Sequence, residues 1–241
     1  MRILITNDDG VWAPGIRVLA EYAKKLGEVT VVAPKTEQSG KSHAIDFTRP
    51  IEIKAVDFMD GVRAFSMDST PADCVRFAVL GLKEHFDLVL SGVNRGFNLG
   101  LDIVYSGTAG AIFEAGRLGL RGIAISTEPD GFDAAEMYLD KVFSFIEQEQ
   151  LLMQNSLYNV NIPRGSGEIY VTRQGGIYFT DDFVKLEGDM YEQVGGIAPC
   201  ESEDLSYDTV AVISQKISIT PLVIEKTNLA VFEKYKGKCK V

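Results

Sequence analysis

The sequence has 241 residues, 46% of them hydrophobic and 24% charged, which is enough to bury a core and excludes a disordered or fibrous chain. Acidic residues outnumber basic ones by 34 to 24, and the formal net charge of −10 argues against a nucleic-acid polymer as a ligand. The cysteines are too far apart to indicate a disulfide framework or a thiolate zinc site. They are Cys74, Cys200 and Cys239.

The first 150 residues alternate short β-rich runs with stretches of helical period, which is the pattern of βαβ units around a buried parallel sheet. Strands are predicted at 3–5, 29–33, 88–90 and 123–125, and helices at 16–26, 70–82, 110–118 and 133–147. The helix at 70 is indicated by a threonine cap followed by Pro71 in the first turn. The pattern predicts a doubly wound α/β fold.

Beyond Asn159 the pattern changes to short strand-like runs separated by glycines, at 169–172 and 177–180, without helical stretches between them. The tail at 226–235 has a helical pattern. We expect an antiparallel appendage here. We therefore expect a catalytic core at 1–150 and a segment at 151–241 that completes the core and carries the appendage. No linker marks the boundary near residue 150, so the two parts can equally form one domain. So small an appendage cannot bury its apolar faces alone, which predicts a homodimer or a dimer of dimers.

Two acids, Asp8 and Asp9, interrupt the apolar N-terminal run before a signal-peptide core could form, and no stretch approaches the roughly eighteen apolar residues of a membrane span. We expect a cytoplasmic protein that does not associate with membranes.

Polar segments follow three of the predicted strands. They are Asn7-Asp8-Asp9-Gly10, Gln38-Ser39-Gly40 and Ser91-Gly92-Val93-Asn94-Arg95-Gly96. Each alone is explained by turn and capping preferences, but ligands of parallel sheets bind beyond the carboxyl ends of the strands, where the three segments would meet. Together they supply carboxylate, hydroxyl and amide oxygens, the hard ligands that Mg²⁺ or Mn²⁺ prefers.

A fourth segment, Tyr105-Ser106-Gly107-Thr108, precedes a predicted helix, so its hydroxyls and backbone N–H groups form a possible anion site. An ordinary serine or threonine N-cap is the alternative. The glycines at 10 and 15 are followed by Ile16-Arg17, which excludes a phosphate-binding P-loop. A dinucleotide fingerprint and a Gly-x-Ser-x-Gly nucleophile elbow are also absent.

These segments, in this order, resemble the SurE-like (survival protein E) 5′/3′-nucleotidase family over nearly the whole chain. The resemblance extends to Thr70-Pro71-Ala72-Asp73-Cys74, Asn159-Val160-Asn161-Ile162-Pro163 and Ser218-Ile219-Thr220-Pro221-Leu222. It implies a three-layer α/β/α, Rossmann-like core with an oligomerisation extension, and hydrolysis of nucleoside 5′- and 3′-monophosphates, in some members also of short polyphosphate. Ser69 and Asp46 depart from the family pattern, where glycine and threonine are expected.

The family's ligands for one Mg²⁺ or Mn²⁺ per subunit correspond to Asp8, Asp9, Ser39 and Asn94. Either aspartate could then serve as the general base. The substrate phosphate would contact Asn94, Arg95, Ser106, Gly107 and Thr108.

His43 and Trp12 are candidate substrate contacts, with a backbone-satisfied loop histidine and a buried tryptophan as the alternatives. Two rival functions are a nucleotide-binding regulatory module without turnover and a covalent aspartyl phosphatase. Asp8-Asp9-Gly10-Val11 lacks the Asp-x-Asp spacing that favours the latter.

Overall fold

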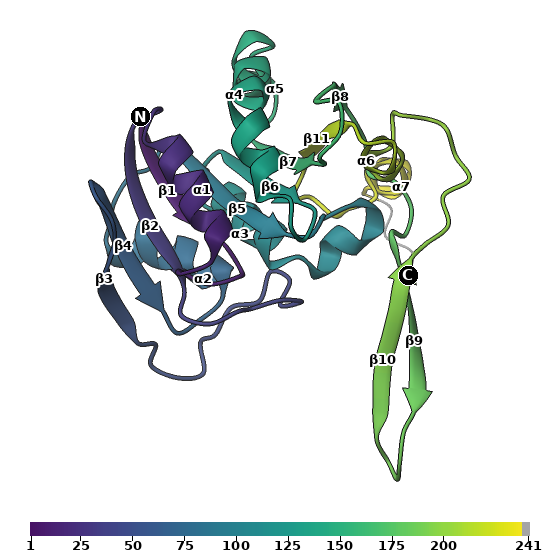
Figure 1. Cartoon of the computed structure of the whole chain (residues 1–241), viewed down its shortest axis with the longest axis horizontal. Coiled ribbons are helices and arrows are strands. Elements are labelled where there is room, and N and C mark those ends of the chain that lie inside the picture. The colour runs from purple at the N-terminus through teal and green to yellow at the C-terminus, as the bar shows by residue number, and fades with distance from the viewer. Residues whose placement is uncertain (238–241) are drawn as a thin grey trace.

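A nine-stranded, mostly parallel sheet forms the centre of the molecule in the computed structural model, which describes residues 1–237 (Figure 1). Cys239 and the end of the predicted 151–241 segment lie outside the described residues. The strand order is β3-β4-β2-β1-β5-β6-β7-β11-β8, and only the β3–β4 and β7–β11 pairs are antiparallel. The strands are β1 Arg2–Thr6, β2 Glu28–Pro34, β3 Ile53–Met59, β4 Val62–Met67, β5 Leu88–Arg95, β6 Gly122–Thr127, β7 Leu157–Ile162, β8 Ile169–Val171 and β11 Ile217–Leu222.

Helices cover both faces of this sheet, because its central strands are apolar on both sides and need cover on both. One core joins α1 and α4 to the sheet, and another joins α2 and α3 to the opposite face. The helices are α1 Pro14–Ala23, α2 Pro71–Arg76, η1 Phe77–Gly81, η2 Gly100–Tyr105, α3 Gly107–Arg117, α4 Phe132–Gln148, α5 Leu151–Gln154, α6 Asp208–Ile213 and α7 Leu229–Tyr235. The predicted α/β fold with its three layers is confirmed.

Two expectations about individual segments were wrong. Residues 91–95 are not a loop after a strand but the continuation of β5. The run at 169–172 belongs to the main sheet, where β8 pairs in parallel with β11, and not to an antiparallel appendage. The first error arose because polar and glycine residues at the end of a strand look like a loop in the sequence, although the neighbouring strands supply their hydrogen bonds. The second arose because β11, the parallel partner of β8, lies much later in the chain, and no local pattern points to that pairing.

The antiparallel extension is a single hairpin, β9 (Phe179–Lys185) paired with β10 (Tyr191–Ile197). It projects from the body of the molecule (Figure 1), and every residue of both strands is exposed. The helix α7 also buries none of its residues. Within residues 1–237, none of the helices has the length and apolar character needed to cross a membrane.

Candidate active site

The carboxyl ends of β1 and β5 meet where the order of strands in the sheet reverses. The chain leaves β1 for β2 on one side and later enters β5 on the other, so the connections diverge and leave a crevice between them. Asp8 and Asp9 follow β1, and Asn94 lies near the end of β5. The fold thus brings two of the predicted polar segments together at the position where open α/β sheets bind ligands.

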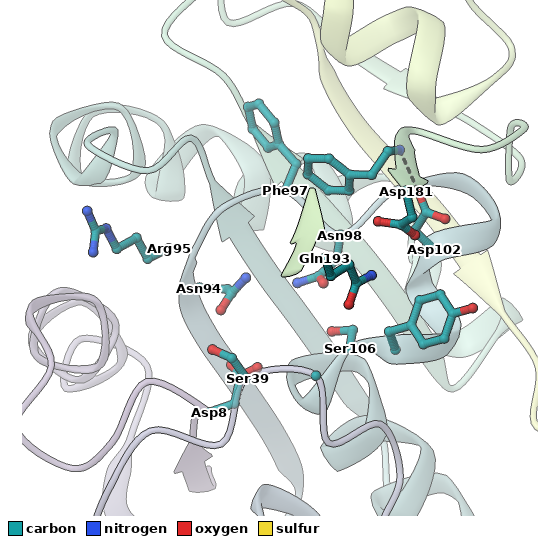
Figure 2. A pocket seen from close by; sticks show the side chains of 13 residues that line it. Asp8, Ser39, Asn94, Arg95, Phe97, Asn98, Asp102, Ser106, Asp181 and Gln193 are labelled. Atoms are coloured by element: carbon teal, nitrogen blue, oxygen red, sulfur yellow. Dashed lines mark hydrogen bonds between the residues drawn. The ribbon is translucent and has the colours of Figure 1, made fainter. Parts of the chain in front are cut away.

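A cleft of about 550 Å³ opens at this edge, within the range of small-molecule sites (Figure 2). Its lining comes from the strand ends, the connection after β2, η2, the start of α3 and the β9–β10 hairpin. The lining residues are Asp8, Ser39, Gly40, Asn94, Arg95, Phe97, Asn98, Asp102, Tyr105, Ser106, Phe179, Asp181 and Gln193. Figure 2 shows Asp8, Ser39 and Ser106 near one another, with Phe97 and Asp181 farther along the cleft.

The turn after β1 is held by its own side chains. Asn7 is buried; its Nδ2 donates to the Gly10 carbonyl at 3.0 Å, and the Gly10 N–H donates back to Asn7 Oδ1 at 3.2 Å. Gly10 has a φ of 107°, a conformation that other residues rarely adopt. This local geometry places Asp8 at the floor of the cleft.

Asp8 is 6% exposed, and the start of α3 packs against its carboxylate. Its Oδ1 accepts a hydrogen bond from the Thr108 hydroxyl at 2.5 Å, and a Cβ added to Gly107 would lie 3.1 Å from Oδ2. Burial raises the pKa of Asp8 to about 6 against the lowering effect of the Thr108 hydrogen bond, and the charge of Asp9 adds to the rise.

Asp9 is half-buried, and its Oδ2 accepts a hydrogen bond from the backbone N–H of Arg95 at 3.2 Å, which ties the β1 turn to the end of β5. Burial raises the pKa of Asp9, although the Arg95 N–H opposes this. Asp9 stands beside the cleft and does not line it.

Asn94 and Ser39 complete the predicted ligand set. The pairing of β5 with β6 is irregular between Gly92 and Asn94, a feature that re-aims side chains near active sites. Asn94 Nδ2 donates to the Gly96 carbonyl at 2.7 Å, which leaves Oδ1 as the amide atom available to a ligand. Ser39 lies in the connection after β2, and its hydroxyl donates to Glu37 at 2.6 Å.

A divalent cation, which the family resemblance implies, fits this donor set. The Asp8 carboxylate is buried, and the charge of half-buried Asp9 adds to the rise of the Asp8 pKa, so a compensating positive charge is favoured here. All the candidate ligand atoms are hard oxygens. No group of three or more His, Cys, Asp or Glu side chains suited to a metal occurs within residues 1–237. A cation here would therefore depend on the Asn94 amide and the Ser39 hydroxyl as well as on the two aspartates.

The residues predicted to hold phosphate are placed differently from one another. Ser106 lines the cleft and also caps α3, because its Oγ accepts the Ala109 N–H at 3.0 Å. Thr108 is fully buried and directs its hydroxyl to Asp8, and Gly107 packs against the same carboxylate. Arg95 reaches the edge of the cleft, but its side chain is turned toward the Pro129 carbonyl, to which Nε donates at 3.2 Å.

Neither of the two further candidates, His43 and Trp12, lines the cleft. The His43 ring pairs with the side chain of Glu114, not with the backbone. Trp12 is 56% exposed, with its ring 6.3 Å from that of Phe58, so it is not buried as the alternative expected.

Sequence reasoning missed the aromatic part of the cleft, which is formed by Phe97, Tyr105 and Phe179, and the polar residues beside it. Phe97 and Asn98 directly follow the polar segment that ends at Gly96. Because ligands bind beyond the carboxyl ends of parallel strands, including two more residues of this segment would have identified both. The hairpin residues carry no such signal, because only the tertiary fold brings β9 and β10 to the strand ends.

Comparison with known proteins agrees with this architecture. The family described as "Survival protein SurE" matches residues 3–181. A protein of Herpetosiphon aurantiacus named 5′-nucleotidase SurE is 41% identical, covering 95% of this chain and 94% of its own, and one of Legionella pneumophila with the same name is 37% identical, covering 97% and 95%. The crystal structure of the Sure protein from Aquifex aeolicus superposes with a TM-score of 0.83 at 33% identity, covering 98% of each chain. The chain belongs to the survival protein SurE family.

Proposed function

We propose that this protein is a divalent-cation-dependent phosphomonoesterase that hydrolyses nucleoside 5′- and 3′-monophosphates, and also short polyphosphate. One observation carries the proposal: a single cleft joins an oxygen-rich end at Asp8, Ser39 and Ser106 to an aromatic end at Phe97 and Phe179. A phosphate and a nucleoside need these two environments side by side. The names of the relatives, 5′-nucleotidases, support the same activity.

The cation would be held by Asp8, Asp9, Ser39 and Asn94. When bound, it would polarise the phosphoryl group and make the attacking water more acidic. Thr108 orients the Asp8 carboxylate through the hydrogen bond at 2.5 Å, and Gly107 lets α3 approach it. Ser106 presents a hydroxyl at the start of α3, where a phosphate oxygen is favoured.

The proposal is tested by a phosphate-release screen over nucleoside 5′- and 3′-monophosphates, ribose 5-phosphate and tripolyphosphate, with Mg²⁺, Mn²⁺, Ca²⁺ or Zn²⁺ added singly. We expect turnover of the nucleotides with Mg²⁺ or Mn²⁺ and loss of turnover with chelator. Saturable nucleotide binding without phosphate release would favour the regulatory module. A phosphorylated Asp8 or Asp9 peptide after acid quench would favour the covalent phosphatase.

We also propose that the protein assembles as a homodimer or a dimer of dimers through the β9–β10 hairpin. Phe183 and Met190 on the hairpin are 64% and 66% exposed, and Ile197 is 63% exposed. An isolated two-stranded hairpin is at best marginally stable in water, and these large apolar side chains are uncovered along its length. The arm therefore needs a partner, and a second copy of the chain supplies the same surface.

Replacing Phe183 and Met190 together by Asp should dissociate the assembly, as measured by light scattering at micromolar concentration. Met137→Asp is the matched control, because Met137 is equally exposed but lies on α4 in the main body. A wild-type protein that is monomeric and fully active at this concentration contradicts the assembly proposal.

A further inference from the structure

The segment that carries Ser39 has no secondary structure of its own. Residues 35–52 connect β2 to β3 without a helix or strand, and Ser39 donates to Glu37 within the same segment. Long loops of this kind inside compact domains are usually either functional or disordered linkers, and this one is tied to the fold by specific hydrogen bonds. The loop is fixed just before Ser39, where the Gln38 N–H donates to the Asp8 carbonyl at 2.7 Å. The position of Ser39 in the cleft therefore depends also on what holds the loop after Ser39.

Just after Ser39, the loop attaches to the wall of the cleft. The Ser42 N–H donates to the Tyr105 carbonyl at 3.0 Å, and the Ser42 hydroxyl donates to the Val104 carbonyl at 2.6 Å. Helix α3 lies directly behind, since a Cβ on Gly110 would be only 2.3 Å from the Ser42 carbonyl oxygen. The loop thus rests against the first turns of α3.

Two buried carboxylates hold the next residues of the loop. Glu114 of α3 accepts a hydrogen bond from the His43 ring at 2.8 Å, and Asp73 of α2 accepts the Asp46 N–H at 2.7 Å. Arg76 joins the two carboxylates, at 3.0 Å from Glu114 and 3.6 Å from Asp73. We call His43, Asp73, Arg76 and Glu114 the loop clamp.

Helix α3 connects the loop clamp to Asp8. Thr108 at its start contacts Asp8, and Glu114 two turns later contacts His43. One rigid element therefore holds both Asp8 and the Ser39 loop. Ser69, one of the two departures from the family pattern, adds a further bond to the clamp by donating to Asp73 at 2.6 Å.

We propose that the loop clamp is a positioning device for Ser39: its ionic contacts hold the loop after Ser39, as the Gln38–Asp8 backbone bond holds it before Ser39, and together they set the place of the Ser39 hydroxyl relative to Asp8. The inference rests on the proposed function for its cation. Glu114 and His43 are positioning residues, since neither lines the cleft. A purely structural role for the same residues would change stability without changing the loop or the cation affinity.

The test uses His43→Ala, His43→Gln and Ser39→Ala in the full chain, with Mn²⁺ affinity measured by calorimetry without substrate and amide hydrogen exchange measured over residues 38–44. We expect His43→Ala to weaken Mn²⁺ binding by about tenfold, the lower end of losses for residues that orient a ligand, and to speed exchange in the loop. His43→Gln should restore most of both, because its amide can donate to Glu114. In the Ser39→Ala background, His43→Ala should add less than about a twofold loss.

Arg117→Gln is the matched control. Arg117 also pairs with Glu114, at 2.6 Å, but it lies on α3 itself, and its hydrogen bonds go to Glu114 and not to the loop. It should lower stability and leave Mn²⁺ affinity and loop exchange unchanged. Equal effects of His43→Ala and Arg117→Gln, or fully additive losses from Ser39→Ala and His43→Ala, would overturn the proposal. If the wild-type protein binds no divalent cation, the metal dependence in the proposed function is wrong. The loop clamp is then tested by amide hydrogen exchange alone, and an unchanged exchange rate over residues 38–44 in His43→Ala overturns it.

Discussion

Asp8→Asn should reduce phosphate release by more than about a hundredfold while the protein remains folded, because losses for residues that only orient a metal ligand already reach that size. Asparagine has nearly the same shape, and its Oδ1 can still accept the Thr108 hydrogen bond. The substitution removes a buried charge that lies close to Asp9, so the melting temperature without cation should rise. Added Mn²⁺ should stabilise the wild type but not the variant.

The measurements are steady-state phosphate release and thermal unfolding with and without Mn²⁺. Asp57→Asn is the control, since it makes the same change in net charge at an exposed position on β3. If Asp8→Asn keeps its activity and this activity still depends on the cation, the assignment of Asp8 as a metal ligand is wrong. An unfolded variant would instead support the reading of Asp8 as a structural cap of the β1 turn.

Glu114→Gln should lower the free energy of unfolding at pH 7 by about 2–3 kcal/mol, with a pH dependence that identifies the charge as the cause. Burial raises the pKa of Glu114, but hydrogen bonds from His43, Arg117 and Arg76 outweigh it and lower the value from 4.5 to about 2. At 1.36 kcal/mol per pH unit, the lowered pKa of Glu114 corresponds to about 3 kcal/mol of stabilisation. Solvent weakens the ion pair with the partly exposed Arg117, which reduces the expected stabilisation toward about 2 kcal/mol.

The sign of the effect follows from the lowered pKa. The stabilisation is fully present above about pH 4.5, where the unfolded chain is also ionised, and it is lost as the pH falls toward 2. The free energies of unfolding of wild type and Glu114→Gln, measured with urea at pH 7, 5, 4 and 3, should therefore approach each other as the pH falls. If the difference in unfolding free energy between the two proteins is the same at every pH, the effect comes from packing and not from the charge. Glu136→Gln is the control, because Glu136 is exposed on α4.

The sequence by itself determined the fold class and most of the oxygen-rich part of the cleft. Hydrophobic period separates strands from helices locally, and the carboxyl ends of parallel strands must meet at one edge of the sheet. The polar segments that contain Asp8, Ser39 and Asn94 follow from that rule, the family resemblance singles out these residues within them, and the structure places all three in one cleft.

Only the tertiary structure decided which side chains face each other. Thr108 and Asp8 are 100 residues apart, and His43 and Glu114 are 71 apart, so their pairing depends on how α3 packs against the sheet. The same holds for Phe179 and Gln193, whose hairpin reaches the cleft through a connection that no local pattern predicts. Local sequence specifies backbone conformation and burial, whereas contacts between distant segments are set by the packing of the whole domain.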